Sequence, residues 1–150
     1  MRIENLTEEH AQAIAGWRYE FPYEWYDTAS DPGRIELFAN PARRDGLRAV
    51  VDDDGELIGF YYFEPKPPDL DYGLGLRPDL VGRGLGLDFF LAGLAFARRR
   101  YRPDRVCLHV AAFNERARRV YERAGFRVVS SHVRKFERFG EVPFLTMADT

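Results

Sequence analysis

Apolar residues recur at about every second position in some stretches of the chain and at helical spacing in others, and these periods predict strands and helices. The predicted strands cover residues 2–5, 47–52, 56–64, 70–76, 105–110, 126–136 and 142–147. The predicted helices cover residues 8–17, 32–40, 84–100 and 114–124. The order is therefore β-α-α-β-β-β-α-β-α-β-β, which is typical of an α/β domain around a mixed sheet.

Capping and turn residues mark several ends of these elements. Thr7 and Asn114 are good helix N-caps, and either Ser30 or Asp31 caps the second helix. Asp53-Asp54-Gly55 supplies the turn of a hairpin. Gly125 closes the last helix as a C-cap.

The third predicted helix, from about Gly84 to Arg100, carries apolar residues in two rows at helical spacing. It is apolar nearly all round, so we expect it to be largely buried. Before it, three prolines interrupt the chain between two predicted strands, at positions 65, 67 and 68.

Length and composition place the chain among ordinary globular proteins. With 150 residues, 45% hydrophobic and 31% charged, we expect one domain over residues 1–150. A single cysteine, Cys107, excludes an internal disulfide and favours a reducing compartment. No apolar run is long enough to span a membrane, and the N-terminal residues lack the apolar core of a signal peptide. We therefore expect a cytoplasmic protein without a membrane partner.

The net charge of −2 hides an uneven distribution. Residues 1–75 carry 16 acidic and 7 basic side chains, a net of −9, and residues 76–150 carry 8 acidic and 15 basic ones, a net of +7. If the two halves form two walls of one cleft, one wall suits a cation and the other an anion. Two solvated faces that balance each other explain the same numbers. Nucleic acid is not the expected partner, because no recognised binding motif interleaves the basic residues.

A glycine-rich stretch between strand and helix is the first candidate for chemistry. It reads Leu-Gly-Leu-Arg-Pro-Asp-Leu-Val-Gly-Arg-Gly-Leu-Gly-Leu over residues 74–87. Glycine lets several backbone N–H groups point the same way, and the helix that follows adds its unpaired amides and positive dipole end. Such a feature binds phosphate or pyrophosphate. A turn that merely needs glycine remains the structural alternative.

Residues 17–27 form an unusual aromatic and acidic segment, reading Trp-Arg-Tyr-Glu-Phe-Pro-Tyr-Glu-Trp-Tyr-Asp. Pro22 and the adjacent rings argue against a simple helix. Rings beside carboxylates form pockets for amines through cation–π contact and ion pairing. The alternative interpretation is that these residues are core side chains beneath a loop.

The second informative stretch runs from Asn114 to Phe126. Asn114 and Tyr121 are two helical turns apart and so share one face of the predicted helix. Taken alone, such a tyrosine packs its ring and finds a partner for its hydroxyl.

Together these two stretches resemble the GCN5-related N-acetyltransferase (GNAT) superfamily. Its phosphate loop has the form (Arg or Gln)-x-x-Gly-x-(Gly or Ala), represented here by Val81-Gly82-Arg83-Gly84-Leu85-Gly86. A later element of the form Asn-x-x-(small)-x-x-x-Tyr-x-x-x-Gly-Phe corresponds to residues 114–126. The predicted element order agrees with that family along the whole chain. The family's fold is a mixed, mostly antiparallel sheet with helices on both faces.

The resemblance implies acetyl-CoA as co-substrate and no metal. The cofactor-binding residues it implies are Leu74, Gly75 and Leu76 along the pantetheine arm, the amides of Gly82, Arg83, Gly84, Leu85, Gly86 and Leu87 at the pyrophosphate, and Asn114 at the pantetheine. One position departs from the motif, because Val81 stands where the family has Arg or Gln. Nearby Arg83, Arg118, Arg119 and Arg123 are candidates to compensate for it.

Direct transfer to an amine requires that the amine lose a proton, since a free alkylamine has a pKa near ~10.4. Two residues compete as the base, His109 and Asp71, and a water relay is a third alternative. Tyr121 is the implied acid for the departing thiolate, and a backbone N–H near residues 74–76 is the implied donor to the thioester oxygen. Cys107 is not expected to be a nucleophile, because direct transfer needs none.

The sequence thus predicts an N-acetyltransferase that acts on a small-molecule or peptide amine. The acidic N-terminal half favours a cationic acceptor, namely a peptide N-terminus, lysine, a polyamine or an aminoglycoside. The acceptor pocket is expected from residues 17–26 and the last hairpin. A homodimer is one expected assembly. The alternatives are a non-catalytic acyl-CoA sensor and a protein-interaction domain on the same scaffold.

Overall fold

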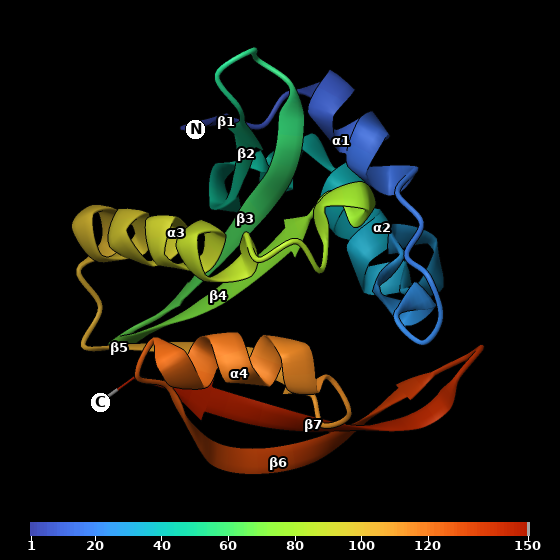
Figure 1. Ribbon diagram of the computed structural model, residues 1–150, viewed down its shortest axis with the longest axis vertical. Coiled ribbons are helices and arrows are strands. Elements are labelled where there is room, and N and C mark those ends of the chain that lie inside the picture. The colour runs from blue at the N-terminus through green and yellow to red at the C-terminus, as the bar shows by residue number, and fades with distance from the viewer. Residues whose placement is uncertain (150) are drawn as a thin grey trace. The chain divides into compact units, whose positions relative to one another are not determined.

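A computed structural model describes residues 1–149, without the side chain of Trp25 (Figure 1). The strands are β1 (Arg2–Asn5), β2 (Leu47–Val51), β3 (Leu57–Lys66), β4 (Asp69–Leu76), β5 (Arg105–Ala111), β6 (Arg127–Phe136) and β7 (Gly140–Ala148). The α-helices are α1 (Glu8–Ala15), α2 (Pro32–Ala39), α3 (Gly86–Tyr101) and α4 (Glu115–Arg123). Short 3₁₀ turns η1 (Glu24–Tyr26), η2 (Thr28–Ser30), η3 (Pro41–Gly46) and η4 (Pro78–Leu80) join them. The predicted order of strands and helices is confirmed.

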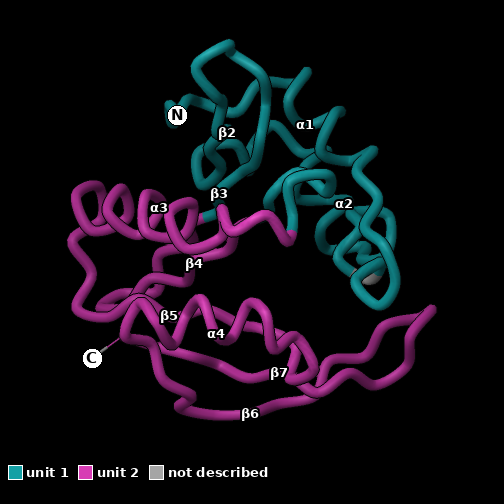
Figure 2. The backbone as a smooth tube through the Cα atoms, in the orientation of Figure 1, with its two compact units in different colours: residues 1–62, 75–81 teal, residues 63–74, 82–150 magenta. Residues whose placement is uncertain are grey.

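The seven strands follow the order β1-β2-β3-β4-β5-β7-β6. β4 and β5 are parallel, whereas the pairs β1–β2, β2–β3, β5–β7 and β6–β7 are antiparallel. The expectation of a mixed, mostly antiparallel sheet is therefore confirmed. Figure 2 separates the chain into two compact units, residues 1–62 with 75–81 and residues 63–74 with 82–150.

The first unit is built from β1, β2, α1, α2 and the adjoining parts of β3 and β4. Thr7 caps α1 as predicted, accepting a hydrogen bond from the His10 N–H, and Asp31 rather than Ser30 caps α2. The core of this unit joins both helices to β2 through Leu6, Ala11, Ile14, Leu37, Phe38, Leu47 and Ala49. Burial of this apolar stripe fixes both helices against the strands.

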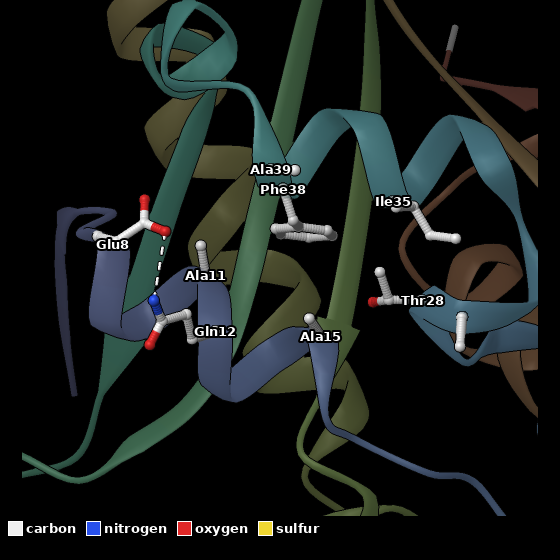
Figure 3. Close-up of a pocket in the computed structure, with 9 residues that line it drawn as sticks. Glu8, Ala11, Gln12, Ala15, Thr28, Ile35, Phe38 and Ala39 are labelled. Carbon is white, nitrogen blue, oxygen red and sulfur yellow. Dashed lines mark hydrogen bonds between the residues drawn. The ribbon is translucent and has the colours of Figure 1, made fainter.

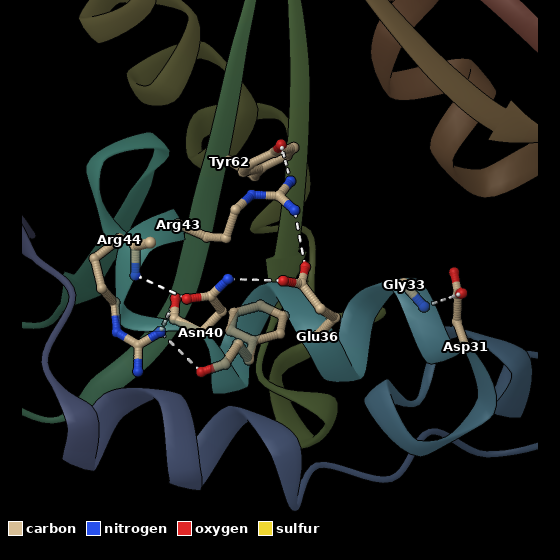
Figure 4. A network of polar contacts seen from close by, with 9 residues as sticks. Asp31, Gly33, Glu36, Asn40, Arg43, Arg44 and Tyr62 are labelled. Carbon is tan, nitrogen blue, oxygen red and sulfur yellow. Dashed lines mark hydrogen bonds and ion pairs between the residues drawn. The ribbon is translucent and has the colours of Figure 1, made fainter.

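Side-chain hydrogen bonds stabilise the connection between α2 and η3 (Figure 4). The Glu36 carboxylate accepts hydrogen bonds from Asn40 Nδ2 and Arg43 Nη1, both at 2.8 Å. Arg44 Nη1 donates to the Phe38 carbonyl at 2.8 Å, satisfying an orphan carbonyl near the end of α2. These side chains fix the path of the chain into β2.

Gly75, near the end of β4, is required by packing. A Cβ at this position would collide with the ring of Phe60. Phe60 in turn meets Phe38 edge-to-face, with ring centroids 5.1 Å apart. Gly75 is therefore part of the core as well as of a candidate ligand-binding segment.

The second unit packs α3 and α4 on one face of its strands. The Tyr72 hydroxyl of β4 donates to the Phe90 carbonyl of α3 at 3.0 Å, and their rings stack with centroids 5.2 Å apart. Phe90 also contacts Tyr121 of α4 and Phe126, with centroids at 4.8 and 5.3 Å. Such aromatic contacts stabilise beyond the area they bury, and here they join both helices to the sheet.

The prediction for the third helix is wrong in two respects. α3 begins at Gly86, not at Gly84, with Leu85 as its N-cap. It is also not buried all round, because Leu91 is 41% exposed, while the buried positions lie on one stripe. The apolar count overestimated burial, since Leu91 faces water and Leu85 precedes the helix.

Two smaller differences concern element ends. β3 continues through Pro65 to Lys66, beyond its predicted end at residue 64. The C-cap of α4 is Ala124, and Gly125 follows it with φ +94°. The Phe126 N–H bonds the Tyr121 carbonyl and the Gly125 N–H bonds that of Glu122, which is the Schellman arrangement that favours glycine there.

Candidate active site

The glycine loop, residues 82–87, leads into α3 with the backbone geometry that its sequence predicts. Gly82 and Gly84 have φ of +82° and +78°, a region that other residues avoid. Within the described part of this unit, a Cβ on Gly84 would meet no atom within 4 Å. The loop is therefore open on the side where a side chain would stand.

The first turn of α3 presents free amides beside this opening. Leu85 makes no side-chain cap, and the first amide bonded back to the loop is that of Phe89, to the Leu85 carbonyl. Within the described part of this unit, the N–H groups of Gly86, Leu87 and Asp88 donate no hydrogen bond. Unpaired amides and the positive dipole end together form an anion-binding feature.

α4 lies against the loop and brings a guanidinium to it. A Cβ on Gly82 would lie 3.2 Å from Arg116 Nη1, and one on Gly86 would lie 3.5 Å from Val120 Cγ2. Arg116 was not among the arginines expected to compensate for Val81. Of those, Arg118 donates to the Ala112 carbonyl and Arg119 pairs with Glu115.

Asn114 caps α4 and Tyr121 lies within this helix, both as predicted. The Asn114 Oδ1 accepts the Ala117 N–H at 3.2 Å as the N-cap of α4, and the residue is buried. Tyr121 is half-buried, with its ring held on Phe90. The tyrosine ring is thus fixed in orientation by α3.

β4 and β5 part immediately after a short paired segment. Their register covers Asp69–Arg105, Leu70–Val106 and Asp71–Cys107, after which β5 continues to Ala111 in pairing with β7. β4 likewise continues, to Leu76. Asp71 and Cys107 therefore stand at the apex of a fork between two parallel strands.

A cluster of polar side chains, Lys66, Asp71, His109 and Thr146, stands at this fork; we call it the His109 cluster. His109 Nε2 lies 3.2 Å from Asp71 Oδ2, and His109 Nδ1 lies 2.9 Å from Thr146 Oγ1. Lys66 Nζ lies 2.9 Å from the same Asp71 oxygen. Because Tyr72 faces α3, alternation places Asp71 on the opposite face of the sheet. The structure thus brings the two predicted bases together, away from α3.

His132 on β6 borders this cluster, with its ring edge-to-face to that of His109 at 5.6 Å. Its pKa lies below the usual value of 6.5, first because it is partly removed from water and then because His109 and Arg134 repel its charged form. A lowered pKa in the folded state means that protonation favours unfolding. This contribution to stability is therefore lost as the pH falls below 6.5.

We expect His109→Gln to raise the pKa of His132 part of the way back toward its usual value, because one repelling group is removed while desolvation and Arg134 remain. A proton NMR titration of the His132 ring in both proteins measures this. Val133→Ala, at an exposed position of the same strand, is the control and should leave the titration unchanged. A His132 pKa that stays equal in His109→Gln would contradict the assigned repulsion.

The aromatic segment is ordered by its own contacts. The Tyr19 hydroxyl donates to the Leu76 carbonyl at 2.8 Å, and burial raises the pKa of Tyr19 far above its usual range. Asp27 is buried and accepts the Tyr19 N–H at 2.7 Å. The guanidinium of Arg34 lies 5.6 Å from the Tyr26 ring centre. One carboxylate and one ring face of the predicted amine pocket are therefore already engaged internally.

A hollow of about 280 Å³ lies in the first unit between α1, η2 and α2 (Figure 3). Its lining is mostly alanine and other apolar side chains, with Glu8 at one end. The Glu8 carboxylate accepts from Gln12 and pairs with Arg44 at 2.7 Å. No residue predicted for the site lines this hollow.

Three further findings bear on chemistry. Burial raises the pKa of the Cys107 thiol, which disfavours the thiolate that a nucleophile needs. No group of His, Cys, Asp or Glu able to hold a metal ion occurs among the described residues. In that same part of the chain, none of the helices has the length and apolar character to cross a membrane.

Within the second unit, the predicted residues gather at two places. In the second unit, the glycine loop, Arg116 and Tyr121 gather where α3 meets α4, and Asp71 joins His109 at the fork. Gly75 and Leu76 lie in the first unit, where the Leu76 carbonyl already accepts the Tyr19 hydroxyl. Sequence reasoning missed Lys66, Thr146 and Arg116, because only pairing across strands and helices places them.

The second unit thus holds a fork between parallel strands, a glycine loop at a helix N-terminus and a tyrosine on the neighbouring helix. The family described as "Acetyltransferase (GNAT) domain" matches residues 1–127. The chain belongs to this family, and the resemblance drawn from its motifs is confirmed.

Curated relatives are mycothiol acetyltransferases. That of Propionibacterium freudenreichii subsp. shermanii is 30% identical over 131 residues, which cover 84% of this chain and 36% of the relative. That of Salinispora arenicola is 40% identical over 105 residues, covering 61% and 34% respectively. The chain thus matches only about a third of the length of these relatives.

Solved structures support the fold. A spermidine N-acetyltransferase from Vibrio cholerae in complex with CoA and spermine is similar with a TM-score of 0.74 and 20% identity, over 98% of this chain and 93% of that one. A ribosomal-protein-alanine N-acetyltransferase from Brucella melitensis gives 0.74 at 17% identity, over 99% of both chains. The GNAT fold predicted from the sequence is therefore confirmed.

Proposed function

We propose that this protein transfers an acetyl group from acetyl-CoA to a primary amine, by direct attack of the amine. The observation that carries the proposal is the open glycine loop at the unpaired N-terminus of α3, with Tyr121 on the adjacent helix. Membership of the GNAT family supports the same chemistry. The domain extends over residues 1–150, and a reducing cytoplasmic compartment suits its single thiol.

The residues present fit the anionic part of acetyl-CoA. Amides of residues 82–87 would hold the pyrophosphate, and Arg116 would supply the positive charge that the motif position Val81 lacks. Within the second unit, the backbone of Leu74 and the side chain of Asn114 would receive the pantetheine arm. Acetyl-CoA supplies the thioester whose acyl carbon the amine attacks.

The amine reaches the reaction as an ammonium ion and must lose a proton. His109 is the base and Asp71 its positioning residue, because Asp71 Oδ2 is already shared by the Lys66 ammonium and the imidazole. A carboxylate held in this way orients the ring and stabilises the imidazolium. This division of roles favours His109 over Asp71 as the proton acceptor.

Tyr121 protonates the departing thiolate. Its ring is fixed on Phe90, so that the hydroxyl keeps one direction while the reaction proceeds. A phenol, whose reference pKa in water is near ~10, is a suitable acid for a thiolate. Acceptors that suit the acidic first half of the chain are cationic amines, including peptides, polyamines and aminoglycosides.

We expect calorimetry to detect binding of coenzyme A, and a thiol-release assay with acetyl-CoA to detect turnover of at least one amine from a panel of peptides, polyamines and aminoglycosides. Binding without turnover of any amine would favour an acyl-CoA sensor. Absence of both binding and turnover would overturn the proposal. The control is the Gly84→Leu variant, in which both signals should be weakened.

A further inference from the structure

The hydrogen bonds of the His109 cluster determine where the imidazole can take up a proton. Asp71 accepts from the Lys66 ammonium at 2.9 Å and so acts as a carboxylate. A carboxylate carries no proton to donate. At the 3.2 Å contact between His109 Nε2 and Asp71 Oδ2, the imidazole is therefore the donor.

A neutral imidazole has one N–H, and in His109 this N–H is on Nε2. The lone pair that can accept a proton is then on Nδ1. Thr146 Oγ1 lies 2.9 Å from that nitrogen, so the threonine hydroxyl donates to it. The basic nitrogen of His109 is thus covered by a hydroxyl rather than open to a substrate.

We propose that Thr146 is the outer member of a proton relay, and that His109 receives the amine proton through the Thr146 hydroxyl. This inference rests on the proposed function. One N–H bond of the ammonium or amine breaks as an O–H bond forms on Thr146. The original O–H bond of Thr146 breaks as an N–H bond forms on His109 Nδ1. The resulting imidazolium is stabilised by Asp71 and later returns its proton to water.

The surroundings of Thr146 suit this role. Thr146 is half-buried and pairs with His109 across β5 and β7, which fixes the distance between hydroxyl and ring. His109 keeps 40% of its side chain exposed, so water or a substrate amine can approach the cluster. On the other side, Thr146 pairs with Ser130 of β6. Ser130 therefore provides a matched hydroxyl one strand farther from the imidazole.

The first test needs no substrate. Long-range nitrogen–proton NMR of the imidazole rings reports which nitrogen carries the proton at a pH where His109 is neutral. We expect the Nε2–H form in the wild-type protein and a mixture of both forms in Asp71→Asn, because an amide can donate as well as accept. The Nδ1–H form in the wild-type protein would overturn the relay.

The second test uses turnover of an amine found by the thiol-release screen. We expect Thr146→Val to lower kcat about 100-fold, the scale typical of lost proton transfer, and Thr146→Ser to restore most of the rate. Binding of coenzyme A should be unchanged in both variants, and Ser130→Ala should keep wild-type kcat. A wild-type kcat in Thr146→Val, or an effect confined to KM, would overturn the relay. If the wild-type protein turns over no amine, the proposed function fails, and the NMR result alone decides the geometry of the relay.

Discussion

Replacing Gly84 by leucine is expected to weaken binding of coenzyme A at least about tenfold, which corresponds to ~1.4 kcal/mol. The new side chain would extend from the loop into the open side, in front of the amides at the start of α3. It would also force a residue with a Cβ to adopt a φ of +78°. Isothermal titration calorimetry measures the affinity, and urea unfolding measures the stability.

Gly55→Leu separates the two consequences of this change. Gly55 lies in the turn between β2 and β3 with φ +82°, and its Cβ position is equally open in the described part of its unit. Both variants should lose about 1–2 kcal/mol of stability through the left-handed backbone. Only Gly84→Leu should lose affinity. Equal affinity in the two variants would contradict the assignment of residues 82–87 to the diphosphate.

The secondary structure was predictable because its signals are local. Thr7, Asp31 and Gly125 act within one turn of their own positions, and Asp54-Gly55 determines a hairpin by itself. The glycine loop was predictable for the same reason. Glycine is the residue that adopts positive φ readily, and Gly82 and Gly84 both do so. The start of α3 was predicted two residues too early, at Gly84 instead of Gly86. Glycine and leucine occur both in loops and in first helical turns, so their pattern does not mark the boundary.

The composition of the candidate site was only partly predictable because it depends on register. His109 and Asp71 were predicted separately, and neither sequence spacing nor motif indicates that their side chains meet. That contact needs the Asp71–Cys107 pair at the apex of the fork. Thr146 joins them only because the final hairpin pairs it with His109, and a slip of one residue would turn its side chain to the other face. Arg116 likewise reaches Gly82 through the packing of α4 beside the loop, which no local pattern encodes.

Replacing Tyr121 by phenylalanine is expected to lower kcat by about 100-fold while binding of coenzyme A is unchanged, because general acid catalysis contributes on this scale. The ring of Tyr121 packs on Phe90 at 4.8 Å, and phenylalanine keeps that contact. The packing of the ring is therefore kept, and urea unfolding measures the effect of losing the hydroxyl on stability. Steady-state thiol release measures kcat, and calorimetry measures affinity.

Tyr101→Phe, at the far end of α3, is the matched control, since it removes a phenol from a ring that also packs in an aromatic cluster, 5.6 Å from Phe63. Its kcat should equal that of the wild-type protein. The dependence on the acceptor sharpens the test. If Tyr121 protonates the thiolate, the loss in kcat should be similar for every amine, because the leaving group is the same in each reaction. A loss that varies strongly with the amine would instead place Tyr121 at the acceptor, and an unchanged kcat would remove it from the reaction.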